Sequence, residues 1–247
     1  MNDEKKIKLD HPDDDIWIHA DSHIEIESRA FSCRKEPDTV KWINTYFQEG
    51  DTALDVGANI GAYSLIMSKV MNNIGSIFAI EPGWHNFYQL NRNIVLNQCQ
   101  DSITALNIAI SDKKSLNTFN YQDLTFGSSL HTLGKHVDFV GNPFKPFIQQ
   151  TVMSYSIDSF VKEFNISHIT HIKIDVDGIE SKVIKGARNT LKKSSCKTLM
   201  IELNDSFEHD LKCIDYIYEC GFTLISKSPN PSLFYESDTV FNYIFAK

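Results

Sequence analysis

The sequence lacks closely spaced cysteines. Its five cysteines, at positions 33, 99, 196, 213 and 220, include no C-x-x-C pair. This pattern argues against a zinc site and a disulfide framework, so we expect reduced thiols and a cytoplasmic location. No apolar signal segment follows the charged N-terminus, and no run of about 18 apolar residues exists, so neither secretion nor a membrane span is predicted.

Basic residues are fewer than acidic ones. Lysine and arginine total 24 against 32 aspartates and glutamates, which gives a formal net charge of -8. Nucleic-acid-binding proteins usually carry a basic surface, so no nucleic-acid partner is expected. With 42% hydrophobic residues in 247, the chain is long and apolar enough for one large α/β domain with a small appendage.

Apolar segments of two kinds alternate along most of the chain. Short apolar runs predict strands over residues 52–56, 76–80, 103–110, 171–175, 198–203, 222–226 and 240–245. Helical spacing predicts helices over residues 60–70, 83–97, 179–192 and 208–220. This alternation is typical of an α/β fold with a mostly parallel sheet and helices on both faces. No helix separates the last two strands, so the seventh strand is expected to be antiparallel.

Two regions depart from this alternation. Residues 1–36 form an N-terminal extension, frayed over 1–15, in which Ile16–His19 and Ile24–Glu27 alternate at period two and predict a small hairpin. A helix opened by Pro37 and ended by Gly50 connects it to the main domain. Residues 112–150 show no helical period, and we interpret them as an irregular, lid-like insertion. Its aromatics, available to stack on a substrate or to pack, include Phe126, Phe139, Phe144 and Phe147.

The segment Asp55-Val-Gly57-Ala58-Asn59-Ile-Gly61 lies where the first of these strands ends and a helix begins. In open α/β sheets, ligands bind outside the carboxyl ends of strands, and glycines there let a ligand approach the backbone. A dinucleotide-binding turn requires G-x-G-x-x-G, whereas this chain has Asn59 and Ala62 at the second and third glycine positions. A nicotinamide-dependent oxidoreductase is therefore the weaker alternative, and Asp55 suits a cationic amino-acid ligand.

Glu81-Pro82 closes the next strand. A carboxylate at this position can accept both hydroxyl hydrogens of a ribose. Further along, Asp175, Asp177 and Glu180 follow another strand within six residues. Clustered carboxylates raise one another's pKa and are typical of acid/base or metal sites.

Several of these segments together carry a resemblance to a known family. The segments 55–61, 81–82, 93–97, 109–112 and 172–180, followed by Gly186-Ala187, resemble the FkbM-type methyltransferases. The resemblance implies a class I Rossmann-like methyltransferase fold, S-adenosylmethionine as methyl donor, and O-methylation of a hydroxyl on a sugar, glycan or natural product. The family usually has Glu where this chain has Asp177, which keeps the charge but shortens the reach by one methylene, so no direct role is assigned to residue 177 here.

The resemblance also assigns roles to residues of the motifs. Asp55, Gly57, Ala58, Asn59 and Gly61 would cradle the methionine part, while Glu81 and Pro82 would hold the ribose. Ile110 would pack on the adenine, and Asn93 and Asn97 are interpreted as packing groups.

Candidate catalytic residues lie mainly at the ends of strands. Asp175 would face the sulfonium and the acceptor, and it is the first candidate base. Glu202 and Asn204 are candidate contacts for the acceptor or for a Mg²⁺ ion. His131 and His136 in the insertion are alternative bases. A catalytically silent binding module with this fold and a homo-oligomer both remain open.

Overall fold

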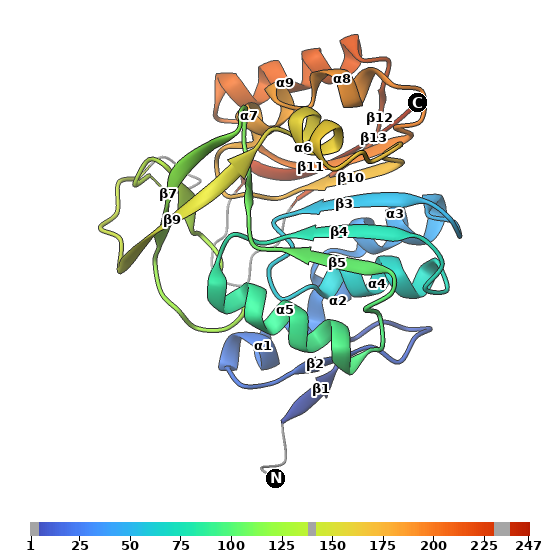
Figure 1. Ribbon diagram of the computed structural model, residues 1–247, viewed down its shortest axis with the longest axis vertical. Coiled ribbons are helices and arrows are strands. Elements are labelled where there is room, and N and C mark those ends of the chain that lie inside the picture. Colours follow the sequence, from blue (N-terminus) through green and yellow to red (C-terminus); the bar gives the residue numbers. More distant parts are fainter. Residues whose placement is uncertain (1–4, 138–141, 230–237) are drawn as a thin grey trace.

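The computed structural model of the chain describes residues 5–137, 142–229 and 238–247. A seven-stranded sheet crosses the molecule in the order β12-β13-β11-β10-β3-β4-β5 (Figure 1). The strands, in chain order, are β3 (Thr52–Val56), β4 (Ser76–Ile80), β5 (Ile103–Leu106), β10 (His171–Ile174), β11 (Thr198–Asn204), β12 (Thr223–Pro229) and β13 (Val240–Ala246). All neighbours pair in parallel except β13, which is antiparallel to both β11 and β12. The prediction of a mostly parallel sheet with an antiparallel last strand is confirmed.

Helices cover both faces of this sheet, as predicted. Successive side chains on a strand point to opposite faces, so Ala53 packs into one core while Leu54 and Val56 pack into the other. The first core also takes residues of α3 (Pro37–Tyr46), α4 (Ala62–Val70) and α5 (Trp84–Leu96). The second takes residues of α6 (Ile157–Glu163), α7 (Glu180–Lys185), α8 (Arg188–Lys192) and α9 (Glu208–Glu219). No helix within the described ranges is long and apolar enough to cross a membrane.

The predicted strand over 103–110 was wrong, because it is divided between two sheets. β5 ends at Leu106, where the Asn107 side chain turns to donate hydrogen bonds to the carbonyls of Glu81 and Pro82, both at 2.9 Å. β6 (Ala109–Ile110) then pairs with β9 in a second sheet. The predicted helix over 179–192 is likewise divided into α7 and α8 near Gly186.

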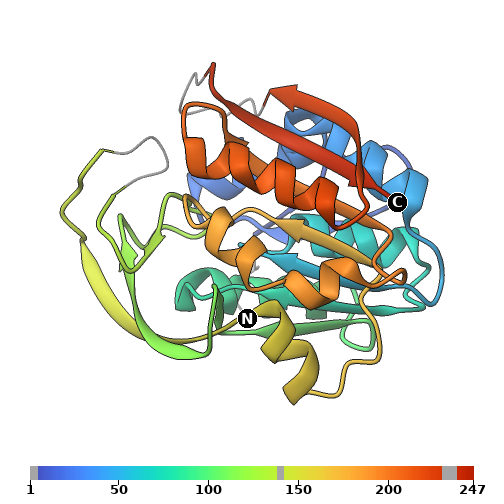
Figure 2. The same ribbon diagram turned by 90° about the horizontal axis from the view of Figure 1, so that it is seen from above.

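The insertion is more regular than the sequence indicated. It contains β7 (Ser115–Tyr121), β8 (Thr132–Leu133) and the start of β9 (Ile148–Tyr155), which together with β6 make a four-stranded sheet in the order β6-β9-β7-β8. β7 and β9 pair antiparallel from Ser115↔Ser154 to Tyr121↔Ile148. Both views show these strands standing beside the main sheet (Figures 1 and 2). The expectation of an irregular segment was therefore wrong, and Phe139 lies outside the described residues.

The N-terminal extension does not form the predicted hairpin. β2 (Trp17–His19) pairs instead with β1 (Lys6–Lys8), in the region expected to be frayed. The segment around Ile24 is helix α1 (His23–Glu27), because Ser22 and Glu25 form a capping box: the Ser22 hydroxyl accepts from the Glu25 N–H, and the Glu25 carboxylate accepts from the Ser22 N–H. A 3-10 turn, η1 (Arg29–Phe31), and α2 (Ser32–Lys35) continue to α3, which ends at Tyr46 rather than at Gly50.

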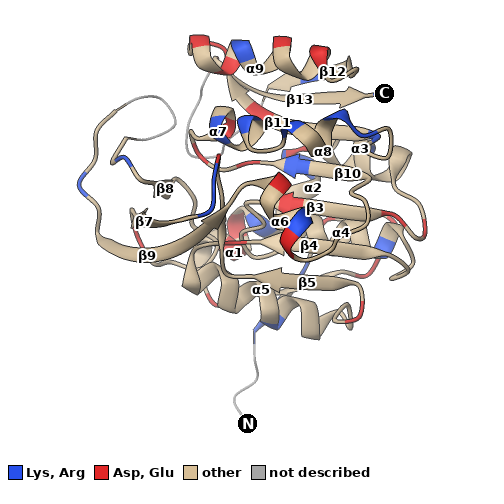
Figure 3. Cartoon of the chain, turned by 45° about the horizontal axis from the view of Figure 1, so that its top comes forward, with Lys and Arg blue, Asp and Glu red and all other residues tan. Residues whose placement is uncertain are grey.

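Two asparagines of α5 fix the extension to the domain. The Asn93 and Asn97 side-chain oxygens accept hydrogen bonds from the backbone N–H groups of His19 and Trp17, each at 2.8 Å. These contacts agree with the packing role expected for both asparagines. On the sheet face opposite α5, α9 carries acidic and basic residues along its length (Figure 3). Among them, Glu208 and Lys212 form an exposed ion pair.

Candidate active site

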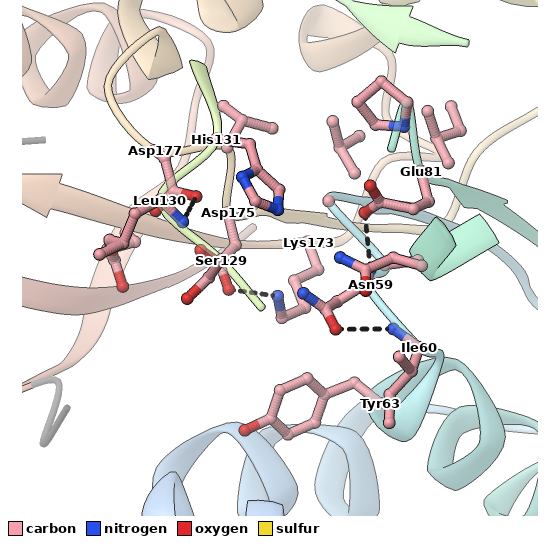
Figure 4. Close-up of a pocket in the computed structure, with 18 of the residues that line it drawn as sticks. Asn59, Ile60, Tyr63, Glu81, Ser129, Leu130, His131, Lys173, Asp175 and Asp177 are labelled. Atoms are coloured by element: carbon pink, nitrogen blue, oxygen red, sulfur yellow. Dashed lines mark hydrogen bonds and ion pairs between the residues drawn. The ribbon is translucent and has the colours of Figure 1, made fainter. Parts of the chain in front are cut away.

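A cavity lies at the carboxyl ends of the central strands β3, β4, β10 and β11 (Figure 4). The four parallel strands end at the same edge of the sheet, so residues distant in sequence meet there. The N-terminal segment and the loop before β8 add two further walls. The residues predicted for the site that line the cavity are Gly57, Ala58, Asn59, Glu81, Pro82, Ile110, His131, Asp175 and Glu202.

The turn after β3 brings the backbone close to the cavity. Gly57 has φ +86° and Asn59 has φ +51°, both in the left-handed region that glycine and asparagine tolerate. The N–H groups of Gly57 and Ala58 both donate to the carbonyl of Ile80, which ties the turn to the end of β4. Gly61, with φ +91°, faces Leu90 of α5 instead of the cavity.

Glu81 is fixed beside this turn. One of its carboxylate oxygens accepts from the Asn59 N–H at 2.9 Å, and the other accepts from the Gly83 N–H at 2.7 Å. Burial raises the pKa of Glu81 to about 7, although these two hydrogen bonds oppose the shift. A carboxylate has about four acceptor positions, so two bonds leave room for hydroxyl donors from the cavity.

A buried lysine organises the carboxylates at the end of β10. Lys173 is paired with Asp55 across β3 and β10, and its ammonium lies 4.0 Å from the Asp55 carboxylate and 3.0 Å from that of Asp175. It also lies over the ring of Tyr63, 5.1 Å from the centroid. Burial lowers the pKa of Lys173, but Asp175 and Asp55 outweigh burial and raise it above its usual value. Lys173 therefore stays charged at neutral pH.

This arrangement changes how two predicted residues can act. Asp55 is not among the residues that line the cavity, and its carboxylate accepts a 2.5 Å hydrogen bond from the Ser64 hydroxyl of α4. Burial raises the pKa of Asp175, but Lys173 outweighs burial and holds it below its usual value. Asp175 is thus an ionised hydrogen-bond acceptor at neutral pH. Asp55 acts on the site indirectly, because its carboxylate helps to keep Lys173 charged.

Asp177 lies in the cavity wall next to this pair. Its carboxylate accepts from the Leu130 N–H at 2.8 Å, which links β10 to the loop before β8 (Figure 4). Burial and the neighbouring charge of Asp175 raise the pKa of Asp177 to about 7. Burial raises the pKa of Glu202 as well, and Asp175 and Asp177 add to the effect. A carboxylate with a pKa near 7 is suited to proton transfer at neutral pH.

His131 reaches the cavity from the insertion, whereas His136 does not. Its Nδ1 accepts from the Gln122 N–H at 3.3 Å, so Nε2 carries the proton and faces the Ser128 hydroxyl at 3.1 Å. Burial and the neighbouring His85 lower the pKa of His131 to about 4. The ring is therefore neutral and a weak base. His136 instead lies 3.0 Å from the Gln149 amide.

An apolar slot and three cationic side chains complete the cavity. Ile110 lies in it together with Pro82, Ala109 and Phe119, a set suited to a flat aromatic ring. Lys173, Arg29 and Lys35 also line it, and the sequence analysis missed all three. Only for Lys173 did the sequence hold a signal, because a strand that alternates Ile172, Lys173 and Ile174 places a lysine on the same sheet face as Asp55.

The expected Mg²⁺ contacts, Glu202 and Asn204, both line a small second pocket beside the main cavity. Among the residues that the structure describes, no group of three or more His, Cys, Asp or Glu side chains is arranged to hold a metal ion. The Asn204 side-chain oxygen accepts from the N–H and hydroxyl of Ser206, and Asn204 is not part of the main cavity. The Mg²⁺ prediction thus gains no support.

Comparison with known proteins decides the family. The methyltransferase FkbM domain matches residues 55–224, from the first strand of the central sheet to β12. The chain belongs to the FkbM methyltransferase family. The matched region holds the Gly57 turn, Glu81, and the Lys173, Asp175 and Asp177 group, whereas Arg29 and Lys35 lie before it.

One curated relative and two solved structures are similar to this FkbM chain. The hexuronic acid methyltransferase AglP of Haloferax volcanii is 27% identical over 178 residues, which span 71% of this chain and 65% of AglP. The precorrin-6y C5,15-methyltransferase of Geobacter metallireducens has a TM-score of 0.50 and 13% identity, with 86% of each chain covered. The tRNA m1G37 methyltransferase of M. jannaschii has a TM-score of 0.53 and 13% identity. The alignment covers 99% of this chain and 55% of the M. jannaschii chain.

These comparisons confirm the Rossmann-like methyltransferase fold. The two solved structures establish that fold alone, because their identities to this chain are low. Neither alternative, the nicotinamide-dependent oxidoreductase or the silent binding module, gains support from them. The cytoplasmic location and the homo-oligomer stay predictions.

Proposed function

We propose that this protein transfers a methyl group from S-adenosylmethionine to an oxygen of a sugar-containing acceptor. One observation supports the proposal most strongly: the Gly57 turn, the Glu81 carboxylate and the Asp175–Asp177 group face a single cavity at the ends of neighbouring strands. Membership of the FkbM methyltransferase family supports the methyl-transfer part of the proposal. The identity of donor and acceptor is our proposal.

The residues present suit S-adenosylmethionine. Glu81 would accept the ribose hydroxyls, because its carboxylate is buried, fixed by two N–H groups and in contact with the cavity. The apolar slot around Ile110 would take the adenine, and the backbone around Gly57 to Asn59 would lie along the methionine part. The carboxylates of Asp175 and Asp177 would offset the positive charge of the sulfonium.

When bound, S-adenosylmethionine supplies a methyl group already activated by its positive sulfur. The protein then has to align the acceptor and remove its proton. We propose that Asp175, held ionised by Lys173, orients the acceptor hydroxyl through a hydrogen bond. Asp177 takes the hydroxyl proton. With a pKa of about 7, part of Asp177 is ionised at neutral pH, and the ionised form binds a proton more readily than an ordinary carboxylate does. This reassigns the base from Asp175 to Asp177.

The insertion would exclude water from this reaction. Ser128 to His131 form the wall opposite the Gly57 turn, and the Ser128 carbonyl accepts hydrogen bonds from the Asn59 and Asn86 side chains at 2.8 and 2.9 Å. The loop before β8 thus reaches the cavity from a separate sheet. We propose that this contact is the closed position of a lid.

The sugar acceptor is proposed from the relative named for hexuronic acid. The test is transfer of a labelled methyl group from S-adenosylmethionine to a panel of neutral and uronate-containing oligosaccharides, followed by mass spectrometry. We expect a product 14 mass units heavier whose methyl group resists mild alkali, as an ether does and an ester does not. Absence of transfer to every saccharide, with cofactor binding intact, would reject the sugar acceptor.

A further inference from the structure

The N-terminal segment supplies two cations to a cavity otherwise rich in carboxylates. Arg29 of η1 and Lys35 of α2 line it together with Glu81, Asp175, Asp177 and Glu202. Both cations come from the extension that precedes the family match. Their contacts, Arg29 with Gly127 and Lys35 with Glu36, do not involve the central sheet or the Gly57 turn. We therefore look for a role in ligand binding.

Arg29 is positioned by one bond and leaves the rest of its guanidinium available. Its Nε donates to the carbonyl of Gly127 at 2.8 Å, which fixes the side chain against the loop before β8. The two terminal nitrogens have no hydrogen-bond or ion-pair partner within residues 5–137, 142–229 and 238–247. A half-buried guanidinium with a free fork is suited to bidentate binding of a planar carboxylate.

Lys35 of α2 lines the same cavity. Its ammonium is 3.5 Å from the Glu36 carboxylate, and 17% of its side chain is exposed. Lys35 and Arg29 both lower the pKa of Asp175, although less than Lys173 does. Both also lower the pKa of Asp177, against the effects of burial and of Asp175. The two cations therefore lie close to the end of β10, where the acceptor would be methylated.

The carboxylate of the methionine part is the other anion that could reach this wall. It has a separate place to bind, because Ala62 and Tyr63 begin α4 and line the cavity, and the first N–H groups of a helix have no partner within it. Arg29 projects from η1 and is held on the insertion loop through its bond to Gly127, and it makes no hydrogen bond to the Gly57 turn within the described residues. The acceptor is thus the better match for Arg29.

We infer that Arg29 and Lys35 form a carboxylate-binding subsite, and that the acceptor is an acidic sugar whose carboxylate is bound there. This inference rests on the proposed function and narrows its acceptor to a uronate. The N-terminal extension would then contribute to substrate selection through these two residues.

The test is titration of D-glucuronate and of D-glucose into the full chain saturated with S-adenosylhomocysteine, followed by NMR. We expect wild type to bind glucuronate more tightly than glucose. Arg29→Gln should weaken glucuronate binding by roughly 10- to 100-fold, and Lys35→Gln by a smaller factor, while glucose binding stays unchanged. Arg34→Gln is the matched control, since Arg34 is exposed, lies over the Phe31 ring and does not line the cavity.

Two results would overturn the inference. One is equal binding, or no binding, of the two sugars by wild type. The other is a loss of S-adenosylhomocysteine affinity in Arg29→Gln without loss of affinity for 5′-methylthioadenosine, which lacks the amino-acid part; Arg29 would then hold the cofactor carboxylate. Lys35→Gln leaves the Gly127 contact intact, so it keeps the test valid if Arg29→Gln unfolds. Failure of wild type to bind S-adenosylhomocysteine would instead count against the proposed function.

Discussion

A Cβ atom on Gly57 would lie 1.8 Å from the carbonyl oxygen of Asp175. The turn after β3 and the end of β10 are therefore in direct backbone contact, and only glycine fits between them. This contact sets the spacing between the part of the cavity proposed for the cofactor and the carboxylates proposed for the acceptor. Both halves of the site depend on it.

Gly57→Ala should therefore lower stability by more than the backbone strain of an alanine at positive φ, because its methyl group would also collide with the Asp175 carbonyl. Gly50 offers a matched control, because it has the same φ of +86° but nothing within 4 Å of the position that a Cβ atom would take. We expect Gly50→Ala to lower the free energy of unfolding by about 1–2 kcal/mol, the cost of a left-handed alanine. Gly57→Ala should cost more and abolish S-adenosylhomocysteine binding. Equal urea midpoints for the two variants would show that the Asp175 contact is not restrictive.

Glu81→Gln should weaken binding of both S-adenosylhomocysteine and 5′-methylthioadenosine, because both carry the ribose. Loss of hydrogen bonds to a charged carboxylate predicts a roughly 10- to 100-fold increase in Kd by calorimetry. The exposed Glu219→Gln serves as the control. Unchanged affinity for 5′-methylthioadenosine in Glu81→Gln would remove Glu81 from the ribose site.

The raised pKa of Glu81 adds a pH dependence to this binding. With a pKa of about 7, the carboxylate is ionised above neutrality and protonated below it. Because the ionised form is the better acceptor for the ribose hydroxyls, affinity should fall as the pH drops from 8 to 6. Calorimetry at several pH values on wild type and Glu81→Gln checks this, and a profile that is flat in wild type would contradict it.

Asp177→Asn should lower kcat by about 10²- to 10⁴-fold, the usual loss on removing a general base. Asparagine tolerates the φ of +55° at this position, so binding of S-adenosylhomocysteine should be unchanged. The wild-type rate should fall as the pH drops below about 7, because protonated Asp177 cannot accept the hydroxyl proton. Steady-state methyl transfer tests this, with the exposed Asp101→Asn as control. An Asp177→Asn enzyme with the wild-type rate would exclude the assignment.

Lys173→Met should destabilise the fold, because it leaves the buried Asp55 carboxylate without its cation. Removing one partner of a buried ion pair typically costs about 3–5 kcal/mol. The double variant Lys173→Met/Asp55→Asn should recover part of that loss, whereas the exposed Lys193→Met should change little. Urea unfolding at pH 7 measures all three. A double variant no more stable than Lys173→Met would mean that the lysine does not act through Asp55.

Local patterns in the sequence predicted the central sheet well. The strands around Leu54 and Phe78 were predicted at their observed bounds, because each is a short apolar run bounded by turn-forming or polar residues. The S-x-x-E capping box at Ser22 and Glu25 was also present in the sequence, but the alternating isoleucines nearby favoured a strand.

Long-range pairing explains the errors elsewhere. β7 is rich in serine, asparagine and threonine, and its partner β9 begins 27 residues after β7 ends, so no local pattern shows that the two strands meet. Arg29 enters the cavity through a contact with Gly127, 98 positions away. The roles of Asp175 and Asp177 depend on distances to Lys173 and Leu130 that the fold alone creates.

Calorimetric titration of S-adenosylhomocysteine into the purified chain tests the central claim most directly. Every role proposed for the Gly57 turn, Glu81 and the carboxylates at the end of β10 requires this ligand in the cavity. The account predicts saturable binding of one ligand per chain, with competition by S-adenosylmethionine. No binding at millimolar ligand would contradict it.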